Sequence, residues 1–140
     1  ERGRDPPHVA RRRGDEVVRL IRRSQAASGS ALRWDPERGT IDRAGLEGVD
    51  AVINLAGENV FGRWSTAKMQ RIRDSRVQGT RVVSDAVAAL TKRPAVLLAA
   101  SAIGYYGDQG DTQLTERSPP GGDFLAEVAR ADRIEPVWRV

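Results

Sequence analysis

The sequence predicts an α/β fold built around a parallel sheet, and three observations support this prediction. The chain has 140 residues, 39% of them hydrophobic and 30% charged, which suits one modest globular domain. Its predicted elements run strand, strand, long helix, strand, an order that favours parallel pairing. The last of these strands, 95–100 (AVLLAA), has no polar residue, and such a strand is typical of a parallel sheet covered on both faces.

The amino-terminal part of the chain predicts a tail followed by a strand. Residues 1–13 are highly charged and include two adjacent prolines, and the segment HVARRRGDE resembles the end of a helix that stops at Gly14. We therefore assign 1–14 to a tail and the remnant of a first helix. The β-branched apolar run VVRLI (17–21) then predicts a strand.

The central part predicts two further strands and a long helix. The segment RWDPERGTID contains proline and glycine, which indicates a short strand or bulge with a turn. The run AVINLAG (51–57) predicts the next strand. Helical spacing of apolar residues extends from Trp64 to about Lys92, with Ser65 as the N-cap and Pro94 as the stop.

The carboxyl-terminal part predicts one short helix. The run FLAEVARA begins behind Asp123, which suits an N-cap. Pro136 then blocks any continuation. We assign 15–130 to the folded domain and 131–140 to a divergent tail.

The composition excludes several classes of function. The chain has no cysteine and one histidine, so we expect no disulfide and no metal site. No apolar run is long enough to cross a bilayer and no secretory signal is present, so we expect a cytoplasmic protein that does not bind membranes. All but two of the 23 basic residues are arginines, a bias that reflects coding composition more than nucleic-acid binding.

Two arginines follow the first predicted strand. In an open parallel sheet, ligands bind outside the carboxyl ends of the strands, and in dinucleotide folds an arginine after the second strand accommodates the 2′-phosphate of NADP. Arg22 and Arg23, with no carboxylate nearby, therefore favour NADP over NAD. Two solvated arginines in an arginine-rich chain explain the same feature equally well.

The next two strand ends are also distinctive. After AVINLAG, the small residues Ala56 and Gly57 would let the backbone lie against a flat ligand, although a tight turn explains them equally well. After AVLLAA comes SAIGYYG, in which Tyr105 or Tyr106 could line a pocket. A catalytic tyrosine needs a partner such as a lysine one helical turn later. Gln109 and Gly110 occupy those positions, so the pair is incomplete.

Five segments taken together resemble one family: RWDP, DAVINLAGEN, DSRVQGTR, SAIGYYGD and LTERSPPGGDFLAEV. They are similar to the NAD(P)-dependent epimerase/dehydratase-like proteins of the atypical extended short-chain dehydrogenase/reductase group, often labelled nucleoside-diphosphate-sugar epimerases. The resemblance runs from about residue 15 to 130. It implies a Rossmann domain, a doubly wound parallel sheet that binds NADP, followed by a smaller carboxyl-terminal domain.

The resemblance also implies roles for individual residues. Arg22 would contact the 2′-phosphate, and Leu55, Ala56 and Gly57 would lie along the adenine and ribose of the cofactor. Arg76, in the motif DSRV, would reach the cofactor from the long helix. Ser101 would lie at the end of the cofactor site next to the nicotinamide.

The sequence departs from catalytic members of the group. Such members carry Tyr-x-x-x-Lys on the helix after the strand AVLLAA, where this sequence has Phe124 and Val128. The usual catalytic Ser/Thr falls on Ala102 or, with a shift of one residue, on Ser101. Ser101 and Tyr105 are thus the candidate catalytic residues.

Relative to the family, the sequence reads as an incomplete copy. No segment of 1–13 reads as the Gly-x-x-Gly-x-x-Gly turn, and the final residues depart from the expected helix. We therefore expect a partial Rossmann fold that lacks the first strand with its Gly-rich turn and the carboxyl-terminal domain. A truncated or frameshifted gene product would account for both ends.

Two functions fit the sequence, and a third does not. The leading hypothesis is an NADP-binding, epimerase-like oxidoreductase acting on a small molecule, with a sugar nucleotide as one candidate. The alternative is a non-catalytic NADP-binding or regulatory protein, which the missing Tyr-Lys pair favours. Nucleic-acid binding through RIRDSRVQGTR is not expected, because Asp74 interrupts the charge and no aromatic residues are interleaved. The sequence makes no prediction of oligomeric state.

Overall fold

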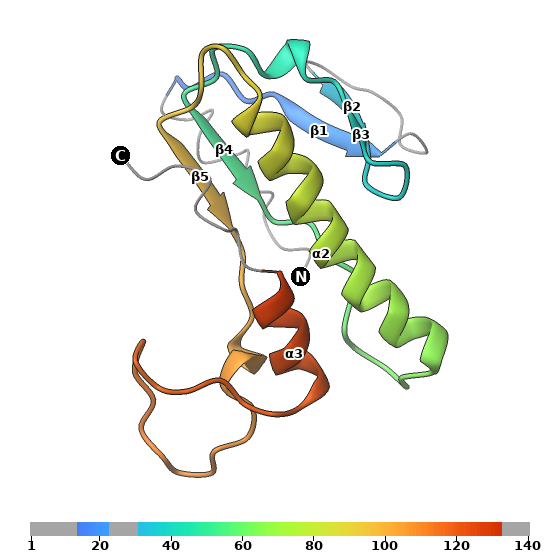
Figure 1. Ribbon diagram of the computed structural model, residues 1–140, viewed down its shortest axis with the longest axis vertical. Helices are drawn as coiled ribbons and strands as arrows, with labels where there is room; N and C mark the ends of the chain where they lie inside the picture. Colours follow the sequence, from blue (N-terminus) through green and yellow to red (C-terminus); the bar gives the residue numbers. More distant parts are fainter. Residues whose placement is uncertain (1–13, 23–30, 133–140) are drawn as a thin grey trace.

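The computed structural model describes residues 14–22 and 31–132. This part of the chain contains both strands and helices, as predicted for an α/β fold (Figure 1). The elements are β1 (Arg19–Arg22), β2 (Ala31–Asp35), β3 (Thr40–Ile41), η1 (Ala44–Leu46), β4 (Ala51–Asn54), α2 (Thr66–Ala88), β5 (Val96–Ala99), η2 (Ile103–Tyr106) and α3 (Phe124–Ala131). The tail and helix remnant assigned to 1–14 lie outside the described residues except for Gly14, as does the final tail beyond Asp132.

The described strands form two sheets. In the first, β1 pairs with β2 in parallel and β2 pairs with β3 antiparallel. In the second, β4 pairs with β5 in parallel. The predicted parallel pairing is thus confirmed, and the carboxyl ends of β4 and β5 lie at the same edge. The first strand begins at Arg19, two residues later than the predicted start at Val17, and it includes Arg22.

The segment RWDPERGTID forms the predicted strand and turn. Strands β2 and β3 are joined by a tight turn in which the Asp35 carboxylate accepts a hydrogen bond from the Arg38 backbone N–H at 3.1 Å. Gly39 closes the turn with a φ of +66°, a conformation that glycine adopts without steric cost. The turn sets the hairpin register that places Trp34 opposite Ile41.

The long helix α2 begins as predicted but ends earlier. The Ser65 hydroxyl caps it by accepting a hydrogen bond from the Lys68 backbone N–H. The helix stops at Ala88, and Leu90 then turns into the core. The Glu47 carboxylate accepts hydrogen bonds from the backbone N–H groups of Lys92 and Thr91, which hold the pKa of Glu47 below its usual range. A side chain distant in sequence therefore fixes the backbone just beyond the helix.

Packing against α2 joins the two sheets. One buried cluster contains Trp34 of the first sheet, Val52 of the second, and Val83 and Val87 of α2. Gly79 of α2 lies against the Trp34 ring, where a Cβ would stand 3.6 Å from the indole. Figure 1 shows α2 running alongside both sheets. A second buried cluster, made by Leu46, Ala86 and Leu90, extends this core.

The other face of β4 and β5 differs from the prediction that both faces are covered. Ile53 and its register partner Leu98 are 61% and 55% exposed, whereas Val52 of the same sheet is buried. Within the described residues, this sheet is therefore covered on the α2 side alone. None of the helices in 14–22 and 31–132 is long and apolar enough to cross a bilayer.

Candidate functional site

A chain of hydrogen bonds crosses the carboxyl edge of β4 and β5. Asn54, the last residue of β4, donates from Nδ2 to the Thr80 hydroxyl of α2 at 3.2 Å. The Thr80 hydroxyl in turn donates to Oδ1 of Asp132, which follows α3. The Asn54 side-chain oxygen accepts from the Ala56 backbone N–H at 3.1 Å. These bonds tie the end of a strand to two helices and to the loop that follows β4.

Arg76 lies at the centre of this edge. Its Nη1 makes a long hydrogen bond of 3.5 Å to the backbone oxygen of Ala100, immediately after β5, and stands 3.8 Å from Oδ2 of Asp132. The guanidinium also lies against the backbone of Gly57, where a Cβ would stand 3.3 Å from it. The Arg76 side chain keeps 19% of its surface exposed. It is therefore anchored by protein groups and still reachable from solvent.

The side chain of Asp132 is only 7% exposed, and its partner Thr80 is buried as well. Burial raises the pKa of its carboxyl, and the Thr80 hydrogen bond and the Arg76 charge oppose that rise. The carboxylate also sits at the C-cap of α3, where the helix dipole disfavours negative charge. Its ionised form therefore depends on Arg76 and Thr80.

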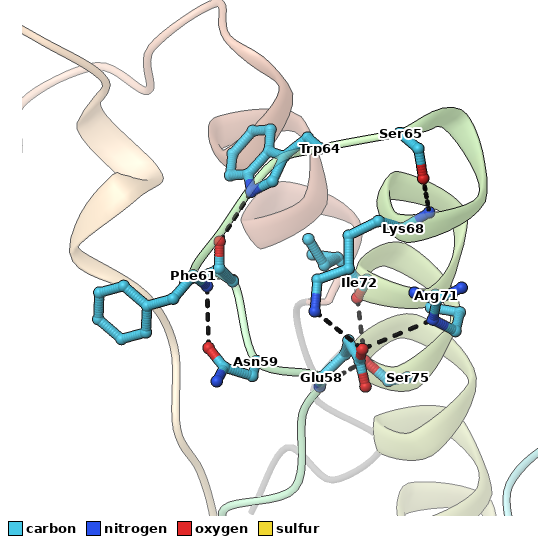
Figure 2. A network of polar contacts seen from close by, with 10 residues as sticks. Glu58, Asn59, Phe61, Trp64, Ser65, Lys68, Arg71, Ile72 and Ser75 are labelled. Atoms are coloured by element: carbon cyan, nitrogen blue, oxygen red, sulfur yellow. Dashed lines mark hydrogen bonds and ion pairs between the residues drawn. The ribbon is translucent and has the colours of Figure 1, made fainter.

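The loop between β4 and α2 is fastened to α2 (Figure 2). The Glu58 carboxylate accepts a hydrogen bond from Lys68 Nζ at 2.9 Å and lies 3.5 Å from Arg71 Nε, while the Glu58 backbone N–H donates to the Ser75 hydroxyl at 2.8 Å. The hydrogen bond from Lys68 is the main cause of the lowered pKa of Glu58. These contacts hold Gly57, next to Glu58, beside α2.

The tip of the same loop reaches α3. The Trp64 indole donates to the backbone oxygen of Val60 at 2.7 Å, and its ring packs edge-on against Phe124 with centroids 5.6 Å apart. The Phe61 ring points away from this contact (Figure 2) and is 84% exposed. The loop is thus held to α2 through Glu58 and to α3 through Trp64.

Beyond β5, the segment SAIGYYG contains η2. The rings of Tyr105 and Tyr106 pack at right angles with centroids 5.0 Å apart. The Tyr105 backbone oxygen accepts from the Gly121 N–H at 2.9 Å, which closes the long loop that leads to α3. Figure 1 shows η2 and α3 together beyond the carboxyl ends of β4 and β5.

The structure gathers most of the predicted cofactor-binding residues. Exposed Leu55 and Gly57, half-buried Ala56, Arg76 and exposed Ser101 all lie at or next to the carboxyl edge of β4 and β5. Arg22 lies in the other sheet, at the end of β1 and in register with Trp34. Arg23 lies outside the described residues.

The surroundings of Tyr105 contain no lysine partner among the described residues. Lys68 is engaged by Glu58, and Lys92 lies before the opposite, amino end of β5. At the two positions that correspond to the Tyr-x-x-x-Lys pair, Phe124 packs on Trp64 and Val128 is buried in the core. Apolar packing thus occupies the places of that pair.

Three residues of the site were not singled out from the sequence: Asn54, Thr80 and Asp132. Asn54 ends an apolar strand, and Thr80 stands four residues after Arg76 on the same helix. These spacings place both side chains at one edge of the sheet. The position of Asp132 depends on how α3 packs, which no local pattern reveals.

A shallow groove lies elsewhere, between the β2–β3 turn and α2. Residues of both elements line it, among them Arg38, Ile41, Arg81 and Val82. Ion pairs with Asp35 and Asp85 engage its two arginines. The groove does not include the edge at which the predicted cofactor residues gather.

Comparisons with known proteins agree on one family. A family model described as the NAD dependent epimerase/dehydratase family matches residues 3–126. An epimerase family protein of Mycobacterium bovis is 45% identical over 113 residues, which are 80% of this chain and 36% of that protein. The chain thus spans little more than a third of that relative's length.

Solved structures show the same fold. The human epimerase family protein SDR39U1, solved with NADPH, superimposes with a TM-score of 0.75 at 25% identity, covering 91% of this chain and 44% of that chain. A nucleoside-diphosphate sugar epimerase from Corynebacterium glutamicum gives a TM-score of 0.67 at 37% identity, covering 85% of this chain and 24% of that chain. With the parallel strands described above, these matches confirm the predicted Rossmann-like α/β fold.

Proposed function

Because the chain belongs to the NAD dependent epimerase/dehydratase family, we propose that the carboxyl edge of β4 and β5 binds NADP. One observation carries this proposal: the partly exposed guanidinium of Arg76 lies against the backbone of Gly57 at the ends of two parallel strands. Ligands of open α/β sheets bind at such an edge. A guanidinium recognises phosphate oxygens through paired hydrogen bonds.

The residues at this edge fit the chemistry of a dinucleotide. Arg76 supplies positive charge for a phosphate, and Gly57 is exposed and has no side chain that would keep the guanidinium away from its backbone. The exposed Leu55 side chain offers an apolar surface to a ring, and the Ser101 hydroxyl offers a hydrogen bond. We propose that residues 15–130 form this cofactor-binding unit, a partial Rossmann domain.

Thermal melting of the 140-residue chain, followed by circular dichroism, tests the proposal. A ligand stabilises only the state that it binds, so millimolar NADPH should raise the melting temperature of a cooperative transition. Adenosine without phosphates serves as the control and should raise it much less. A transition that NADPH leaves unchanged would contradict cofactor binding by this chain.

We propose that Arg22 makes the site prefer NADP over NAD, by binding the 2′-phosphate from the end of β1. The variant Arg22→Ala should lower the affinity for NADPH on the order of tenfold, because it removes a charge-assisted contact. NADH has no 2′-phosphate, so its affinity should change little. Fluorescence titration of both cofactors against both proteins measures this. Equal losses for NADPH and NADH would remove the assignment of Arg22.

For the chemistry, we propose an oxidoreductase acting on a small molecule, with Ser101 and Tyr105 facing the reacting groups. The likeness to a sugar nucleotide epimerase makes a sugar nucleotide the first substrate to test. When bound, the cofactor would accept a hydride from the substrate or donate one to it. Oxidation or reduction of the cofactor in the presence of such substrates, followed by absorbance, would detect turnover.

A second candidate is an NADP-binding protein without catalysis. The observation that favours it is the apolar packing of Phe124 and Val128, together with the engagement of Lys68 by Glu58. No described lysine is then left near Tyr105 to assist proton transfer. NADPH binding without any turnover over a panel of carbonyl compounds and sugar nucleotides would support this candidate over the first.

A further inference from the structure

We propose that Asp132 is an internal competitor for Arg76, so that its carboxylate weakens the affinity of this edge for phosphate-bearing ligands. The inference rests on the proposed function, since it concerns the same arginine. It adds Asp132, the residue that follows α3, which neither the motifs nor the comparisons assign. Asp132 thereby becomes a determinant of how tightly a dinucleotide is held.

The Asp132 carboxylate lies beside the Arg76 guanidinium, which is the group that a phosphate would bind. Oδ2 of Asp132 lies 3.8 Å from Arg76 Nη1, the nitrogen that also reaches the Ala100 backbone oxygen. An incoming phosphate would bring a second negative charge to one guanidinium. Like charges close together disfavour each other's ionised forms, most strongly where water is excluded.

The carboxylate cannot easily turn away to make room. Oδ1 accepts a hydrogen bond from Thr80, which is itself bonded by Asn54, so the side chain is held from α2 and, through Thr80, from β4. It is almost fully buried. A phosphate would therefore meet a fixed negative charge at a fixed position.

The position of Asp132 does not stabilise its own helix. A carboxylate at the C-cap faces the negative end of the helix dipole, and burial adds to this cost. Its favourable contacts are those to Thr80 and Arg76. Removal of the charge while the shape is kept should thus leave the fold intact and free Arg76.

The variant Asp132→Asn tests the inference. Asparagine keeps the size and an acceptor for Thr80 but carries no charge. We expect it to bind both NADPH and inorganic pyrophosphate on the order of tenfold more tightly than the natural chain, as measured by isothermal titration calorimetry. The control Asp85→Asn makes the same change of net charge at an exposed position on α2, nine residues from Arg76, and should change neither affinity.

The two probes separate this inference from the proposed function. Tighter binding of pyrophosphate by Asp132→Asn, with no NADPH binding by any variant, would support the competition and contradict the cofactor proposal. Unchanged or weaker binding of pyrophosphate by a folded Asp132→Asn would overturn the competition, because Asp132 would then serve to orient Arg76. If circular dichroism shows Asp132→Asn to be unfolded, Asp132→Ala carries the same expectation and the same contradicting result.

Discussion

Replacing Trp34 with alanine is expected to lower the free energy of unfolding by about 3–5 kcal/mol, as for other large buried aromatic residues. Trp34 is 6% exposed and belongs to the core cluster that joins both sheets to α2. Its ring also fills the space above Gly79, so truncation leaves a cavity at the point where the sheets meet the helix. Urea unfolding followed by circular dichroism measures the loss.

The matched control for Trp34→Ala is Phe61→Ala. Phe61 is also aromatic but mostly exposed at the loop tip, so its removal should change the free energy of unfolding by no more than about 0.5 kcal/mol. Equal effects of the two substitutions would mean that Trp34 does not lie in the core that joins the sheets.

Gly121→Ala is expected to cost about 1–3 kcal/mol of stability, the usual range for overpacking. A Cβ at Gly121 would stand 2.7 Å from both the Gly107 nitrogen and the Tyr106 backbone oxygen. Both are backbone atoms, so no side chain can move aside. The substitution should also break the hydrogen bond from Gly121 to Tyr105 and displace η2 from the candidate site.

The neighbouring glycine provides the control for this prediction. A Cβ at Gly122 meets nothing within 4 Å, and Gly122→Ala should therefore leave the melting temperature nearly unchanged. Parallel melting curves of the two variants compare them directly. If Gly121→Ala melts at the natural temperature, the close approach of the two loop segments is wrong.

Local patterns were sufficient to predict most of the fold. Apolar runs located β4 and β5, and the residues Ser65 and Asp123 marked the starts of α2 and α3, where the structure shows both caps. The end of α2 was misplaced, because Glu47, distant in sequence, binds the backbone at Thr91 and Lys92. Such a contact leaves no local signal.

The site was predictable only in part, for a similar reason. Motif and strand-end reasoning selected Gly57 and Arg76, and the structure brings them together. It could not select Asp132, because that residue reaches Arg76 only after α3 packs on α2. The roles assigned to Ser101 and Tyr105 stay predictions.

A titration of the ¹⁵N-labelled chain with NADPH, followed by NMR, tests most directly whether the carboxyl edge of β4 and β5 is the dinucleotide site. If NADPH binds at this edge, the amide signals of Ala56, Gly57 and Ser101 and the side-chain Nε signal of Arg76 shift together and saturate. Shifts confined to the groove between the β2–β3 turn and α2, at residues such as Ile41 and Val82, would contradict binding at this edge.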